Sequence, residues 1–277
     1  MNIRDFKAMV SLLDDPDVAT EVRDNLRGIG PEILPLIEAE LDTYAPEGEV
    51  RKKMEALRNE LQSDAVYGQL KAWADGGGED LLKGLWLISQ LVYPNTTLDS
   101  LRAEMNRIYL DVWVQMRENM HPADVLNILN TTIFEDLGFE PNVKSFHSPQ
   151  NSLFNQVLSE RTGNPVSLSC VYILLAQKLD IPLYGVNLPN LFVTLYDLPG
   201  RPFYVNVFNK GQIFYKRDID DYLKQMNLEP RKEYYQACTH IEIVTRVLTN
   251  LAFAYQKSGQ PELEEQVNRI LEGLQSH

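Results

Sequence analysis

Hydrophobic residues recur at helical spacing over most of this 277-residue chain, and one later stretch alternates as β-strands do. Residues 3–41 repeat apolar positions every three or four residues, with DDPDV and a Gly-Pro turn as helix breaks. A second helical block is expected at 50–73. It ends at Gly76–Gly78, which we interpret as a hinge or linker because consecutive glycines do not continue a helix cheaply. Residues 1–75 are therefore expected to form a helical N-terminal region.

The helical period resumes at Glu79 and predicts further helices up to Leu137, including one over Pro122–Leu137. After Pro182 the pattern changes to three short β-type segments, LYGVNL, LFVTLYD and FYVNVF, separated by turn residues. Helical spacing then returns, with an apolar stripe from Ile241 to Tyr255 and a last helix that Pro261 begins. The order of helices, a small antiparallel sheet and further helices predicts a mostly helical α+β fold.

Composition narrows the classes of function. The hydrophobic content of 44% allows a buried core, and the formal net charge of −13 argues against a sequence-independent grip on nucleic acid. The apolar runs fall short of the roughly 18 to 20 residues that a membrane span needs. Two cysteines form no disulfide framework, and the first residues lack a signal-peptide pattern. We therefore expect a cytoplasmic protein that contacts neither nucleic acid nor membrane.

The segment RTGNPVSLSC invites a search for a catalytic thiol, since a helix start favours a thiolate. Cys170, however, falls several residues inside the predicted helix, beyond its free N–H groups. The strands that follow contain no histidine to act as a base; the four histidines are His121, His147, His240 and His277. We interpret Cys170 as a small buried apolar side chain.

Neither a metal nor a cofactor is predicted. The cysteines and histidines lack ligand spacing, and the acidic clusters DIDD and ELEE are typical of helix first turns. Asparagines are the polar residues that gather around the candidate segment. They are expected to hold loop backbone in place, with recognition of a bound peptide as the alternative; they are Asn151, Asn155, Asn164, Asn187, Asn190 and Asn206.

The run NSLFNQVLSERTGNPVSLSCVYILLAQKLDIPLYGVNLPNLFV resembles the transglutaminase-like core family typified by the bacterial invasion regulator SirB. The resemblance implies a papain/transglutaminase-like core over 79–225 and a tetratricopeptide-like helix pair over 226–277. Separately, the pattern from Leu12 to Leu41 resembles one HEAT repeat, with an ordinary helical hairpin as the alternative.

The resemblance also implies where catalytic residues would stand. The family's cysteine position falls near Pro165 to Ser167, its histidine position at Leu191 and its acidic position at Asn206. We expect Leu191 to point toward the N-terminal end of the helix at 166–179, with Val193 and Leu195 on the same face. The predicted vestigial cleft contains no catalytic residue, and its candidate members are Asn155, Arg161, Asn164, Pro165, Ser167, Ser169, Cys170, Leu191 and Asn206.

These features favour a non-catalytic module that binds or regulates a protein partner through the cleft and its helical arms. The alternative is a hydrolase or acyltransferase that uses Cys170, Ser167 or Ser169 with an unconventional base.

Overall fold

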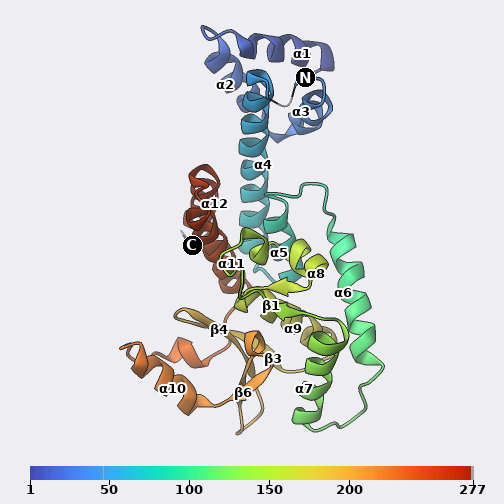
Figure 1. Cartoon of the computed structure of the whole chain (residues 1–277), viewed down its shortest axis with the longest axis vertical. Coiled ribbons are helices and arrows are strands. Elements are labelled where there is room, and N and C mark those ends of the chain that lie inside the picture. The colour runs from blue at the N-terminus through green and yellow to red at the C-terminus, as the bar shows by residue number, and fades with distance from the viewer. Residues whose placement is uncertain (46, 276–277) are drawn as a thin grey trace. The chain divides into compact units, whose positions relative to one another are not determined.

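A computed structural model describes residues 1–45 and 47–275 (Figure 1). The chain divides into two compact units. The first contains Met1–Ala72 with Gln90–Pro94, and the second contains Trp73–Ser89 and the chain from Asn95 onward. The predicted separation of 226–277 from the core at 79–225 stays a prediction.

The first unit is helical, as predicted. It contains α1 (Ile3–Ser11), α2 (Ala19–Ile29), α3 (Leu34–Leu41) and the part of α4 (Glu49–Asp75) that ends at Ala72. Their apolar stripes meet in one core, which includes Phe6, Leu26, Ile37 and Leu57. Three helices precede α4, because a 3₁₀ turn and Gly30 at φ +96° separate them, and α2 and α3 are the two that lie within Leu12–Leu41. The HEAT character of this region stays a prediction.

In the second unit, helices precede the sheet. They are α5 (Leu81–Ser89), α6 (Leu98–Trp113), α7 (Pro122–Asn130) and α8 (Phe154–Glu160). The helix predicted over 122–137 ends as α7 at Asn130 and continues as one π-helical turn, Thr131–Asp136. A short parallel bridge that the sequence did not predict joins β1 (Glu140–Pro141) to β2 (Thr162–Gly163).

The central helix is α9 (Pro165–Lys178). Asn164 caps it, Pro165 occupies its first turn, and Ser167 completes a reciprocal capping box with Asn164. All residues from Val166 to Ala176 are buried, so α9 is surrounded by protein. Gly163 precedes the cap because a Cβ there would lie 2.5 Å from Ser167 Oγ.

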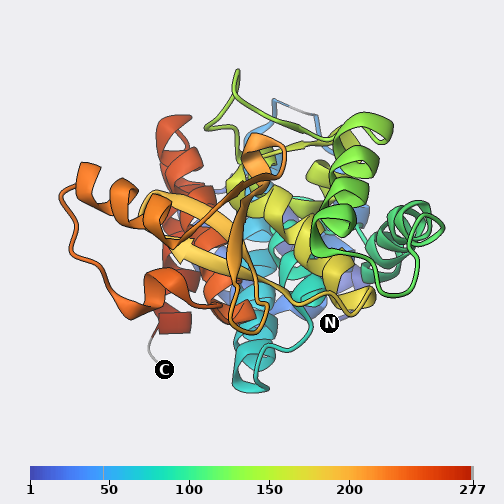
Figure 2. The same ribbon diagram turned by 90° about the horizontal axis from the view of Figure 1, so that it is seen from below.

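The sheet is an antiparallel meander of β3 (Leu183–Leu188), β4 (Leu191–Tyr196), β5 (Phe203–Asn206) and β6 (Gln212–Phe214). The first three strands confirm the β-type segments of the sequence. The turn between β3 and β4 places Asn190 at φ +56°, a conformation that asparagine tolerates better than most residues. One face of the sheet packs on α9 and α11 (His240–Lys257), and the other on α10 (Lys216–Gln225), whose buried residues are Ile219 and Leu223 (Figure 2).

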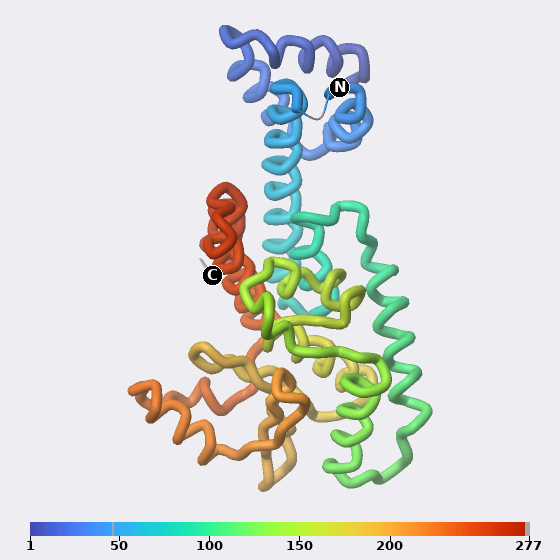
Figure 3. Tube along the Cα trace, in the orientation of Figure 1, coloured from blue at the N-terminus to red at the C-terminus, as the bar shows by residue number. Residues whose placement is uncertain are grey.

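The chain continues from α11 into α12 (Pro261–Gln275), and the two helices lie side by side (Figure 3). A Thr239–Glu242 capping box begins α11. Gly259 at φ +68° separates α11 from α12, which begins at Pro261 as the sequence predicted. The expected mostly helical α+β fold with a small antiparallel sheet is thus confirmed.

Candidate functional site

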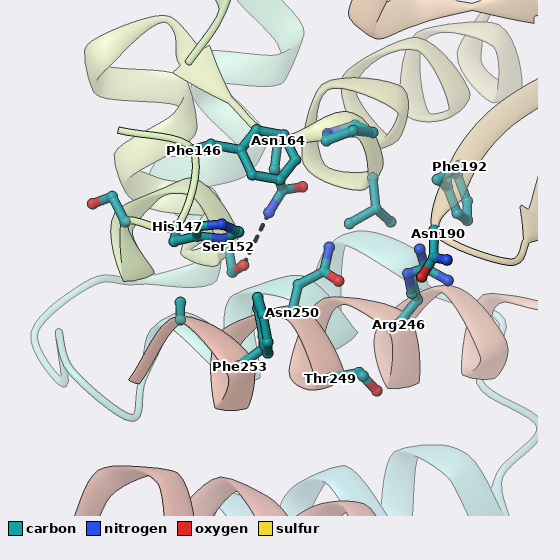
Figure 4. A pocket seen from close by; sticks show the side chains of 14 residues that line it. Phe146, His147, Ser152, Asn164, Asn190, Phe192, Arg246, Thr249, Asn250 and Phe253 are labelled. Carbon is teal, nitrogen blue, oxygen red and sulfur yellow. Dashed lines mark hydrogen bonds between the residues drawn. The ribbon is translucent and has the colours of Figure 1, made fainter. Parts of the chain in front are cut away.

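A cavity of about 410 Å³ opens at the N-terminal end of α9. We call it the α9 pocket. Four segments line it: the loop at 146–152, the first residues of α9, the start of β4, and one face of α11 (Figure 4). Of the predicted cleft residues, Asn164 and Pro165 line this pocket.

Two asparagines fix the loop side of the pocket. Asn151 is 1% exposed; its Nδ2 donates to the carbonyls of Ser145 (2.8 Å) and Phe146 (3.0 Å). Asn164 accepts at Oδ1 from the Ser167 backbone N–H (3.0 Å), and its Nδ2 donates to Ser152 Oγ (3.0 Å). Both asparagines therefore hold backbone and loop in place, as buried amides must if their polar atoms are to be satisfied.

The helix α11 contributes a polar and aromatic face. Arg246, Thr249, Asn250 and Phe253 follow the spacing i, i+3, i+4, i+7 and all line the pocket. Arg246 Nη1 donates to Asn187 Oδ1 (3.0 Å) and to the Leu188 carbonyl (3.2 Å). Burial lowers the pKa of the Arg246 guanidinium, with Tyr222 acting in the opposite direction.

The sheet side is formed by the β3–β4 turn. Asn190 and Phe192 line the pocket, and Tyr222 Oη of α10 donates to the Pro189 carbonyl (2.6 Å) and so holds the turn. In Figure 4 the Arg246 side chain reaches from α11 toward Asn190. The Arg246 guanidinium therefore lies between α11 and the β3–β4 turn.

Aromatic rings form the outer wall. His147 packs edge-to-face on Phe146 and on Phe253, with ring centroids 5.2 Å apart in each pair. Phe146 and Phe253 are each 44% exposed. The wall is therefore aromatic and accessible to solvent, and Lys257 Nζ lies 5.1 Å from the centroid of the Phe253 ring.

Cys170 does not reach the pocket. Its side chain is 0% exposed, and burial, followed by repulsion from neighbouring Cys238, raises the pKa of the thiol. A thiol with a raised pKa is a poor nucleophile at neutral pH. The geometry agrees with the sequence-based interpretation of Cys170 as a buried apolar side chain.

The two candidate serines are also turned into the helix. Ser167 Oγ accepts from the Asn164 N–H (3.0 Å) and donates to the Asn164 carbonyl (3.2 Å). Ser169 Oγ donates to the Pro165 carbonyl (2.7 Å). Both hydroxyls are buried, and each stabilises the first turns of α9.

Among the described residues, no histidine forms a hydrogen bond with Cys170, Ser167 or Ser169. His121 Nδ1 accepts from the Ala123 N–H at the start of α7, and His240 contacts Gln177 and the Gly78 carbonyl. His147 lies beside Ser152 in Figure 4, without a hydrogen bond between them. His277 lies outside the described residues.

Leu191 and Asn206 lie elsewhere. Both line a separate hollow of about 250 Å³ against α10, where Leu191 packs on the cluster that contains Val193, Leu195 and Ile219. The prediction that Leu191 points toward the N-terminal end of α9 is wrong. Because Leu191 pairs with Leu188 in the hairpin, it shares the face that α10 covers. Asn206 Oδ1 accepts from the Asn209 N–H.

Asn155 and Arg161 line a third hollow, beside α6. Arg161, at φ +57°, forms an ion pair with Glu104 and lies 4.7 Å above the Phe139 ring. Asn155 Oδ1 and Arg161 Nη1 are buried with no hydrogen-bond partner within the described part of the chain. The nine predicted cleft residues are therefore spread over three hollows and the interior of α9.

Sequence reasoning missed Arg246, Asn250, His147 and Ser152 as pocket residues. A signal existed for α11: polar and aromatic residues at i, i+3, i+4 and i+7, opposite the apolar stripe. A loop residue such as Ser152 offers no comparable periodicity.

A helix whose N-terminal end faces a pocket, followed by an antiparallel sheet packed on that helix, is the core arrangement implied by the family resemblance. Residues 99–249 match the Transglutaminase-like superfamily. The chain belongs to this superfamily.

Several proteins are similar to parts of the chain. A UPF0162 protein of Vibrio cholerae is 26% identical over 145 residues, 52% of this chain and 53% of the relative. The UPF0162 protein YchA of Escherichia coli is 24% identical over 196 residues, 69% and 72% of the two chains. Human F-box only protein 21 is 35% identical over 157 residues, which cover 48% of this chain and 25% of that protein.

The alignment with a UPF0162 protein of Xylella fastidiosa covers 49% of that protein, so this chain spans about half the length of such a relative. No solved structure matches the chain. Among the described helices, none combines the length and apolar character that crossing a bilayer requires.

Proposed function

We propose that this transglutaminase-like chain is a binding or regulatory module for a protein partner and performs no acyl transfer. The more specific kinship with SirB belongs to the same proposal. The supporting observation is the composition of the first turn of α9, where Asn164, Pro165 and Val166 face the pocket instead of a nucleophile.

The thiol and hydroxyl groups near the start of α9 are not available as nucleophiles. Thiol catalysis needs a thiolate within hydrogen-bond reach of a base, whereas Cys170 is fully buried and its pKa is raised. Ser167 and Ser169 donate to backbone carbonyls of α9. Leu191 packs against α10 and therefore gives no support to this proposal.

One pair favours an alternative function. Ser152 and His147 both line the α9 pocket, and Asn164 Nδ2 donates to Ser152 Oγ. A serine hydrolase would need His147 to accept the Ser152 proton at about 2.6 to 3.2 Å. Ser152 is 2% exposed and has no hydrogen bond to His147, so the pair lacks the arrangement of a general base and nucleophile.

The test combines turnover and labelling on the intact chain. Ester hydrolysis, amide hydrolysis and amine incorporation into glutamine peptides are measured for the wild type and for Ser152→Ala. A fluorophosphonate and iodoacetamide report reactive serines and thiols. We expect no turnover by the wild type or by Ser152→Ala, and we expect slow labelling of the thiols. Turnover that disappears in both Ser152→Ala and His147→Gln would contradict the proposal and support the hydrolase.

The partner is expected to be a protein and not nucleic acid or a membrane, consistent with the net charge of −13. The N-terminal helices, as a HEAT-like unit, and the pair α11–α12, as a tetratricopeptide-like unit, would supply further contact surface. Deleting the N-terminal helices should weaken partner binding without creating an enzyme.

A further inference from the structure

The α9 pocket contains an arginine without an acidic partner. Among the described residues, no carboxylate lies within ion-pair distance of Arg246. In the described part of the chain, Arg246 donates hydrogen bonds only from Nη1, so Nε and Nη2 have no acceptor there. A half-buried charge without a counter-ion is costly, and an anion bound beside it would offset that cost.

The guanidinium is already held in place. Asn187 Oδ1 and the Leu188 carbonyl accept from Nη1 at 3.0 and 3.2 Å and fix the plane of the fork. Arginine presents two parallel N–H groups to a carboxylate, and little side-chain freedom remains to be lost here on binding. The pocket therefore contains a preorganised carboxylate receptor.

Further donors surround this group. The Asn250 amide points into the cavity in Figure 4 and has no hydrogen-bond partner among the described residues. Asn190 also lines the pocket, and its amide has no hydrogen-bond partner in that part of the chain either. Ser152 Oγ accepts from Asn164, and no acceptor is recorded for its own proton within that described part. These neutral donors suit the oxygen atoms and backbone of a bound peptide.

The opposite wall is aromatic. The edge-to-face rings of Phe146, His147 and Phe253 are exposed and would cover a large apolar side chain. Arg246 is the only lysine or arginine that lines the pocket among the described residues. One cation matches one carboxylate better than it matches a dianionic phosphate.

We propose that the α9 pocket binds the C-terminal residue of a partner polypeptide, with its carboxylate on Arg246 and a large apolar side chain against Phe146 and Phe253. This inference rests on the proposed function. A volume of about 410 Å³ falls within the range of roughly 300 to 1,000 Å³ of ligand pockets. Capture of a terminal carboxylate is a recurring mode of peptide recognition.

The experiment is calorimetric titration of the intact chain with an N-acetylated Gly-Ser-Gly-Ser-Gly-Phe peptide. One form has a free C-terminal carboxylate and the other a C-terminal amide. We expect the amide to bind about tenfold more weakly or worse, because it cannot form the charged bidentate contact. N-acetylphenylalanine is the third ligand, and it should bind more weakly than the peptide acid.

Variants connect the binding to the pocket. Arg246→Gln should weaken binding of the peptide acid about tenfold or more and remove the preference over the amide. Arg217→Gln, an exposed arginine of α10 outside the pocket, is the matched control and should bind as the wild type does. If Arg246→Gln fails to fold, Asn250→Leu is the second variant: it removes a donor from the cavity wall, breaks no hydrogen bond among the described residues, and should also weaken binding of the peptide acid.

Equal binding of peptide acid and amide, or unchanged binding in both pocket variants, would overturn the inference. Binding of N-acetylphenylalanine as tightly as the peptide would overturn the assignment to a chain terminus. These results leave the proposed function intact, because only substrate turnover contradicts that proposal.

Discussion

The buried thiol of Cys170 makes a prediction about stability at alkaline pH. Its side chain is 0% exposed, and burial raises its pKa in the folded chain above the free-thiol value of about 8.5. Above about pH 8.5 the unfolded chain releases this proton while the folded chain retains it. The free energy of unfolding should therefore fall as pH rises, and it should be unaffected by this group below that value.

The size of the effect follows from proton linkage. One proton released only on unfolding lowers the free energy of unfolding by about 1.4 kcal/mol per pH unit. Between about pH 8.5 and 10, Cys170 alone should cost about 2 kcal/mol. Cys238, whose pKa burial and then Glu242 raise to about 12, acts in the same direction. The pKa of Tyr172 is also raised by burial, but a tyrosine contributes only above about pH 10.

The assay is urea unfolding followed by tryptophan fluorescence across this pH range. All three tryptophans, Trp73, Trp86 and Trp113, belong to the second unit, so the signal reports the unit that contains Cys170. Cys170→Ala should reduce the slope of unfolding free energy against pH, and the double variant with Cys238→Ala should flatten it. The same slope in wild type and double variant would refute the buried-thiol explanation, as would rapid iodoacetamide labelling of Cys170 in the folded chain.

Two other substitutions test packing. In Gly84→Ala, the new Cβ would lie 2.7 Å from Val244 Cγ2 and 2.9 Å from Trp73 Cζ2, so overpacking of about 1 to 3 kcal/mol should outweigh a helix-propensity gain of at most about 1 kcal/mol. Gly68→Ala, with open space around it, should instead stabilise α4 by up to about 1 kcal/mol; circular dichroism melts in which both variants shift alike would contradict this. Leu191→His should lower the melting temperature and generate no hydrolysis, since Leu191 packs on the α10 cluster and faces no nucleophile. A variant as stable as the wild type that hydrolyses an ester would show that a working site was overlooked.

The sequence by itself determined most of the elements, but not the β1–β2 bridge or β6. Asn164, Pro165 and the apolar run after them predicted α9, and alternation with turn residues predicted β3, β4 and β5. These signals are local, because capping and side-chain periodicity depend on residues a few positions apart. The burial of Cys170 also followed from its place inside an apolar helix.

Only the tertiary structure decided which side chains meet. Leu191 and Phe192 are neighbours in sequence, yet the Leu188–Leu191 pairing turns Leu191 toward α10 and Phe192 toward α9. The α9 pocket brings together residues from 146 to 254, including Arg246. Periodicity assigns a residue to a face of its own element, but it contains no information on which distant element covers that face, because that choice depends on packing of the whole unit.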